Sequence, residues 1–104
     1  MKGNDLVRQL VLESICNDYE NVDQVILPEI VDKASNFGLH IDRPEIVEAL
    51  AGLVAAGLAK AYLLSTQKPF FTELEGMPPL DTIETDLKTY FYITDSGRNL
   101  ILSE

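Results

Sequence analysis

Apolar residues recur every three or four positions in the first part of the chain. Over residues 4–18 this spacing predicts a helix, because side chains at such intervals share one helical face. The face expected to be buried consists of Leu6, Val7, Leu10, Val11 and Ile15. Leu12 and Cys16 are also one turn apart, but they fall off this face. We therefore expect them to offer apolar surface on another side of the helix.

The second helix is marked by its end residues. Residues 19–23 are polar and predict a loop, and residues 24–26 are interpreted as a short first strand. Pro28 suits the first turn of a helix, where its missing N–H leaves no hydrogen bond unmade. Gly38 is typical of the left-handed residue that ends a helix. The apolar face expected between them consists of Ile30, Val31, Ala34 and Phe37.

A short turn, residues 39–41, separates this helix from a third one. Asp42 is a favourable N-cap, and Pro44 and Glu45 stand in the first turn, where proline and acidic side chains are preferred. Gly57 is expected to end the helix. Two helices joined by so short a turn form a helix-turn-helix arrangement. The residues of the third helix expected to be buried are Ile46, Val47, Leu50, Leu53 and Val54.

Two later segments predict strands. Ala59–Leu64 and residues 90–94 are rich in aromatic and aliphatic side chains and contain no internal breaker;. We expect these strands to pair antiparallel, with residues 65–89 as an unusually long loop between them. Thr94 fits an N-cap, so residues 96–102 are predicted to form a short closing helix.

Composition favours one domain over residues 1–104, since 46% of the 104 residues are hydrophobic and can form a core;. Cys16 is the only cysteine, so no intrachain disulfide can form and a reducing compartment is expected. The N-terminus turns polar and acidic before any apolar run, unlike a signal peptide. The longest apolar stretch is shorter than the ~20 residues that a membrane span needs. The sequence thus predicts a soluble, cytoplasmic protein.

Charge is the strongest compositional feature. The formal net charge is −9, from 17 acidic and 8 basic residues. Nucleic-acid affinity depends largely on cations that neutralise phosphates, so the overall field repels DNA. The bases are scattered and form no visible patch: Lys2, Arg8, Lys33, Arg43, Lys60, Lys68, Lys88 and Arg98.

The order of these elements resembles the winged-helix fold of bacterial regulators, especially the MarR-like and PadR-like kinds. The resemblance implies an α+β fold with a three-helix core, a helix-turn-helix, a two-stranded wing with a long loop, and a short C-terminal helix. The matching positions belong to turns, core, helix ends and strands, so they specify a fold better than an activity. They are residues 37–42, Ile46, Leu50, Leu53, Gly57, Leu58, Tyr62 and residues 93–98.

In DNA-binding members of this family, the third helix enters the major groove. The resemblance places Arg43, Glu45, Glu48, Ala49 and Gly52 at the positions that touch bases. Arg43 alone is of a type that base edges and phosphates attract. Glu45 and Glu48 would face the phosphates at an energetic cost.

The wing departs from the DNA-binding pattern in the same way. Residues 69–87 carry five acids and no base: Glu73, Glu75, Asp81, Glu84 and Asp86. The expected function is therefore a non-enzymatic protein-interaction module with a regulatory role and poor intrinsic DNA affinity. The alternative is a DNA-binding transcriptional regulator, which the resemblance itself favours.

Large apolar residues alternate with the acids of the wing: Phe70, Phe71, Leu74, Met77, Leu80 and Ile83. Either these side chains fold back onto their own domain, or they contact another chain, most simply a second copy. We expect a homodimer, because exposed apolar groups that gather in one patch are usually covered. Its candidate contacts are Phe70 and Phe71 on the wing and Leu12 and Cys16 on the first helix.

Nothing in the sequence predicts a catalytic residue, a metal or a cofactor. His40 is the only histidine and stands in a turn, and one histidine with one cysteine cannot form a zinc site of usual composition. The carboxylates lack the spacing of a calcium loop, and the chain has no glycine-rich phosphate loop.

Overall fold

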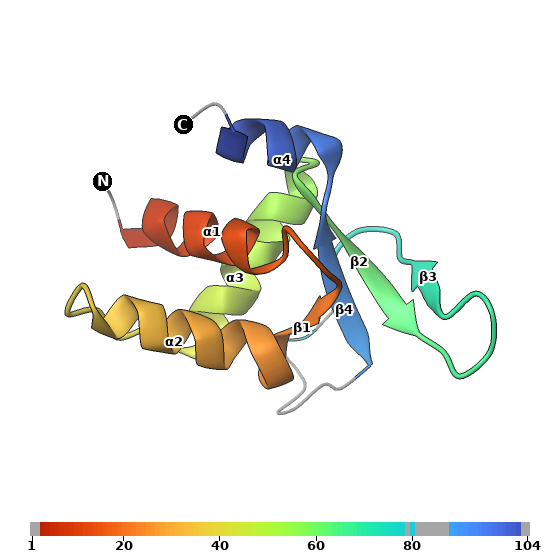
Figure 1. Ribbon diagram of the computed structural model, residues 1–104, viewed down its shortest axis with the longest axis horizontal. Coiled ribbons are helices and arrows are strands. Elements are labelled where there is room, and N and C mark those ends of the chain that lie inside the picture. Colours follow the sequence, from red (N-terminus) through yellow and green to blue (C-terminus); the bar gives the residue numbers. More distant parts are fainter. Residues whose placement is uncertain (1–2, 79, 81–87, 103–104) are drawn as a thin grey trace.

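The computed structural model describes residues 3–78, 80 and 88–102, which form an α+β fold. Helices cover one face of an antiparallel four-stranded sheet with the strand order β1-β4-β2-β3 (Figure 1). No helix in these residues has the length and apolarity needed to cross a membrane. The helices are α1 (Gly3–Ser14), α2 (Leu27–Ser35), α3 (Arg43–Ala55) and α4 (Asp95–Leu102), and the strands are β1 (Glu20–Asn21), β2 (Ala59–Leu64), β3 (Phe71–Glu73) and β4 (Thr89–Ile93).

Helix α1 forms as predicted but ends at Ser14, four residues before the expected end. The Ile15 N–H still donates to the Val11 carbonyl, as in a helix. The Ile15 carbonyl, however, accepts from the Ile93 N–H of β4 at 3.3 Å. The Ile15 carbonyl is thus bonded to the sheet instead of to a further helical turn, and the helix ends here.

The segment expected as a first strand is helical instead. Val22–Ile26 forms a π-helical turn that runs directly into α2, and the strand β1 lies just before it. Asn21 causes the change, because its Oδ1 accepts from the Asp23 and Gln24 N–H groups at 3.0 Å each. Its Nδ2 also donates to the Thr89 carbonyl at 2.9 Å. This buried asparagine therefore both caps a helix and links that helix to the sheet.

The predicted ends of α2 and α3 are confirmed. Gly38 and Gly57 have φ of 70° and 75°, the left-handed conformation that glycine adopts at low cost. In each case the next residue closes the helix end, since the Leu39 N–H donates to the Ala34 carbonyl and the Leu58 N–H to the Leu53 carbonyl. Asp42 stands at the N-cap of α3, within a capping box with Glu45;.

Two residues of the face predicted for α2 are not buried. Phe37 lies beyond the helix end and is 64% exposed, and Val31 is 40% exposed. The helix spans only Leu27–Ser35, so its buried stripe is narrow and consists of Ile30 and Ala34.

The two predicted strands pair antiparallel as expected, with Ala61 opposite Phe91 and Lys60 opposite Tyr92. The strand β3 was not predicted. It forms a hairpin with β2, in which Leu64 faces Phe71. At the other side of the sheet, β1 pairs with β4.

Helix α4 begins where the sequence predicts. The Thr94 hydroxyl donates to the Gly57 carbonyl at 2.7 Å and accepts from the Gly97 N–H at 3.1 Å. Thr94 therefore caps α4 and fastens it to the end of α3. Gly97 permits this close approach, because a side chain there would collide with the Leu58 carbonyl oxygen.

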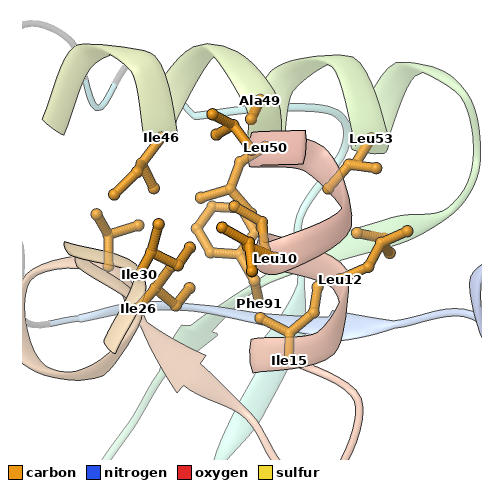
Figure 2. Close-up of a cluster of buried hydrophobic side chains, with 14 of the residues drawn as sticks. Leu10, Leu12, Ile15, Ile26, Ile30, Ile46, Ala49, Leu50, Leu53 and Phe91 are labelled. Carbon is orange, nitrogen blue, oxygen red and sulfur yellow. The ribbon is translucent and has the colours of Figure 1, made fainter. Parts of the chain in front are cut away.

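The core lies between the helices and the sheet. Figure 2 shows the Phe91 ring pointing from β4 among side chains of the helices. Burying a side chain of this size contributes roughly 1.5–3 kcal/mol. The largest fully buried side chains are Phe91, Ile15, Ile26, Ile30, Ile46, Leu50, Leu53, Leu80, Val11 and Val22.

Candidate interaction surfaces

Arg43, the one candidate base reader of suitable type, is engaged within its own chain. Its Nε donates to Asp23 Oδ1 at 2.7 Å and its Nη2 to Asp23 Oδ2 at 3.1 Å. The third nitrogen, Nη1, donates to the Leu80 carbonyl at 2.8 Å. The side chains of Arg43 and Asp23 are only 18% and 10% exposed. The guanidinium therefore links α3 to the segment before α2 and to the wing rather than pointing outward.

The exposed start of α3 is acidic. Glu45 and Glu48 are both exposed, and the Glu45 carboxylate accepts from the Asp42 N–H at 3.3 Å. His40 lies beside Asp42, with 2.8 Å between Nε2 and Oδ1, and both side chains are largely exposed. Carboxylates at this end suit the positive end of the helix dipole, but they repel phosphate.

Two small residues of α3, Ala49 and Gly52, serve packing inside the chain. Ala49 is 5% exposed and belongs to the core, so its expected place among the exposed residues that touch bases is corrected. Gly52 lies under the Arg8 side chain of α1, since a Cβ on it would be 2.5 Å from Arg8 Nη2. The close approach that Gly52 permits is therefore made by α1.

Of the two dimer contacts expected on the first helix, Leu12 is corrected. Leu12 is only 3% exposed and belongs to the core, so it offers no surface for a dimer. The helix buries a wider arc than one stripe, because α2, α3 and α4 all contact it. Cys16 is half-buried, and its thiol donates to the Glu13 carbonyl at 3.0 Å.

Most apolar wing residues in the described part of the chain fold back onto their own domain, which was one of the two alternatives for them. Leu80 is 1% exposed, and Leu74 and Met77 pack against the core. Phe70 differs, since 49% of it is exposed. Four wing residues named above lie outside the described residues: Asp81, Ile83, Glu84 and Asp86.

The open face of the sheet carries an aromatic cluster that the sequence analysis missed. Tyr19 stacks on Phe71 with ring centroids 4.1 Å apart and planes inclined by 7°. Tyr62 and Tyr92 meet Tyr19 edge to face, at 5.0 and 4.8 Å, and Tyr90 meets Phe71 at 5.4 Å. The alternation of tyrosine with Phe91 in residues 90–92 is the signal that could have revealed this second apolar face.

Polar groups border this aromatic cluster. Lys60 Nζ lies 2.9 Å from Glu73 Oε1, across the β2–β3 hairpin. Arg98 of α4 lies 6.0 Å from the Tyr92 ring centroid. Burial raises the pKa of the Tyr62 hydroxyl, and the nearby Tyr19 raises it further. The cluster is therefore a packed layer that stabilises the hairpin, with Phe71 as part of it.

The chain matches no family model, and it has no significant match among curated proteins or among solved structures.

Proposed function

We propose that the fold is a winged helix. The chain order of α1, β1, α2, α3, β2 and β4 supports this proposal, as does the pairing of β1 with β4 beside β2. In this interpretation α2 and α3 form the helix-turn-helix, with α3 as its second helix, and the β2–β3 hairpin belongs to the wing.

We further propose that the protein is a non-enzymatic, regulatory protein-interaction module with poor intrinsic affinity for DNA. The internal engagement of Arg43 carries this proposal. A reading helix needs Arg, Lys, Asn or Gln side chains that reach bases or phosphates. Arg43 donates to Asp23 and to the Leu80 carbonyl instead.

The charges around that position support the same conclusion. Glu45 and Glu48 are exposed on the outer face of α3. Lys60, a base on β2, is paired with Glu73 at 2.9 Å. A DNA duplex brought against α3 would meet like charge without the compensating counterion release that drives such binding.

The alternative, a DNA-binding transcriptional regulator, is favoured by the order of helices and strands alone. A gel shift with random-sequence duplex DNA at low salt distinguishes the two functions, because non-specific binding is strongest there. We expect no shift from the proposed module. A clear shift whose affinity falls steeply in a salt series would overturn the proposal and favour the regulator.

A further inference from the structure

The strand β3 has one edge that faces away from the sheet. In the β2–β3 ladder, the Ser65 N–H donates to the Phe70 carbonyl and the Leu74 N–H to the Ala61 carbonyl. Backbone groups alternate in direction along a strand, so the N–H and C=O groups of Phe71 and Glu73 point outward. No described residue bonds to them, and Figure 1 shows β3 at the side of the sheet away from the helices.

The same hairpin carries exposed apolar side chains. Leu63 is 42% exposed, Leu64 is 38% exposed and Phe70 is 49% exposed. Leu63 and Leu64 are neighbours on one strand, so they lie on opposite faces of the sheet. The hairpin is therefore apolar on both faces next to an unpaired edge, and such edges readily template pairing with another chain.

We propose that β3 pairs antiparallel with β3 of a second copy, about a two-fold axis at Thr72. This inference rests on the proposed interaction function and names its partner. The edge is self-complementary in this register, because Phe71 falls opposite Glu73 of the second copy and each exchanges two backbone hydrogen bonds with it. The two symmetric pairs provide four bonds and join the two sheets into one.

Local charge fits a second copy. The whole chains repel, each with a net charge of −9, but Glu73 is already neutralised by Lys60 at 2.9 Å. The axis brings each Glu73 beside a phenylalanine rather than beside the other carboxylate. A basic peptide would gain little from Glu73, since that acid already has a cation, whereas the register of a second copy places no carboxylate of β3 opposite another.

The small apolar area exposed on the hairpin limits how tightly two copies bind. An aromatic side chain buries ~150–250 Å² when fully covered, so Phe70, which is 49% exposed, offers on the order of 100 Å² of apolar surface per protomer. Leu63 and Leu64 lie one strand behind, on β2. A standard interface takes ~800 Å² from each partner. Even with four backbone bonds added, this contact stays below the standard size, so we expect a weak dimer whose population depends on protein concentration.

Sedimentation equilibrium of the full chain over a concentration series, at low and high salt, tests the dimer. A monomer–dimer equilibrium is expected, and it should tighten as salt screens the like charge. A monomeric mass at every concentration and salt would overturn the proposal. The proposed function would survive that result, because the DNA gel shift tests it separately.

Two variants at one position test the edge. Glu73→Ala and Glu73→Pro both remove the ion pair with Lys60, and both leave the N–H donors of the β2–β3 ladder intact. Only proline also removes an outward N–H. We expect Glu73→Pro to dimerise at least tenfold more weakly than Glu73→Ala. Equal association of the two variants would contradict the proposal, with circular dichroism as the folding control.

Amide hydrogen exchange of the parent chain gives a test that needs no variant. Protection of the Phe71 and Glu73 amides should rise with protein concentration, as the dimer population rises. A dimer that forms without added protection at these two amides would place the interface elsewhere and overturn the proposal.

Discussion

The Arg43 guanidinium donates two hydrogen bonds to the Asp23 carboxylate, with Nε 2.7 Å from Oδ1 and Nη2 3.1 Å from Oδ2. This two-point contact is the strongest geometry for such a pair. Because Arg43 Nη1 also holds the Leu80 carbonyl at 2.8 Å, one side chain fixes the start of α3, the helical turn before α2, and the wing.

Arg43→Ala should therefore destabilise the fold. Removing one partner of a largely buried ion pair leaves the Asp23 carboxylate without its cation, at a cost of about 3 kcal/mol. Arg43→Lys keeps the charge but loses the planar fork, so we expect a smaller loss. Urea unfolding measures both variants, and an Arg43→Ala free energy of unfolding within about 0.5 kcal/mol of the parent would contradict the expectation.

Two glycines within helices should respond differently to alanine. A methyl group at Gly97 would clash with the Leu58 carbonyl oxygen and lie 2.8 Å from Ile93 Cγ1. Because this backbone is unable to move freely, Gly97→Ala should cost ~1–3 kcal/mol or more. Thermal unfolding followed by circular dichroism provides the measurement.

Gly52→Ala is the matched control. The three atoms nearest to its methyl group would all belong to the end of the flexible Arg8 side chain, which can rotate away. Alanine also favours a helix over glycine by about 1 kcal/mol. We expect the stability to stay within about 1 kcal/mol of the parent. Similar losses for both variants would refute the steric explanation for Gly97.

Glu20 should make stability depend on pH. Burial first, and then the Asp18 and Glu29 carboxylates, raise the pKa of Glu20 above its usual value. The folded protein then binds this proton more tightly than the unfolded chain does. Unfolding free energy therefore falls as pH rises from the unfolded-state pKa through the folded-state pKa, and the penalty is complete above it.

Glu20→Gln removes that penalty. The variant should melt at a higher temperature than the parent at neutral pH, and the difference should shrink at a pH below the carboxyl pKa in both states. Glu48→Gln changes the net charge equally on the exposed face of α3 and serves as the control. A Glu20→Gln advantage that is unchanged by acid would contradict this prediction.

Helix ends and main strands could be predicted because their signals are local. Pro28 restricts the backbone of the first helical turn, and Gly38 and Gly57 permit the left-handed conformation that ends a helix;. Residues 24–26 were expected to form a short strand but are helical, because the Asn21 side chain caps a helix there. The strand β3 could not be predicted, since three residues become a strand only through the ladder with β2.

The candidate surface was harder to predict because it depends on long-range contacts. Arg43 is 20 residues away from Asp23 and 37 from Leu80, and nothing in the pattern around Arg43 indicates either partner. Leu12 was placed outside the core because a single helical stripe was assumed. With three helices packed around α1, more than one face is buried.

The outward acids of α3 are central to the proposal that the protein acts through protein contacts. Fluorescence anisotropy with random-sequence duplex DNA, over a salt series, measures their effect directly on the parent and on Glu45→Lys/Glu48→Lys. We predict no binding by the parent at low salt and binding by the variant that weakens as salt rises. Binding of the parent itself at low salt, with an affinity that falls steeply as salt rises, would contradict the account.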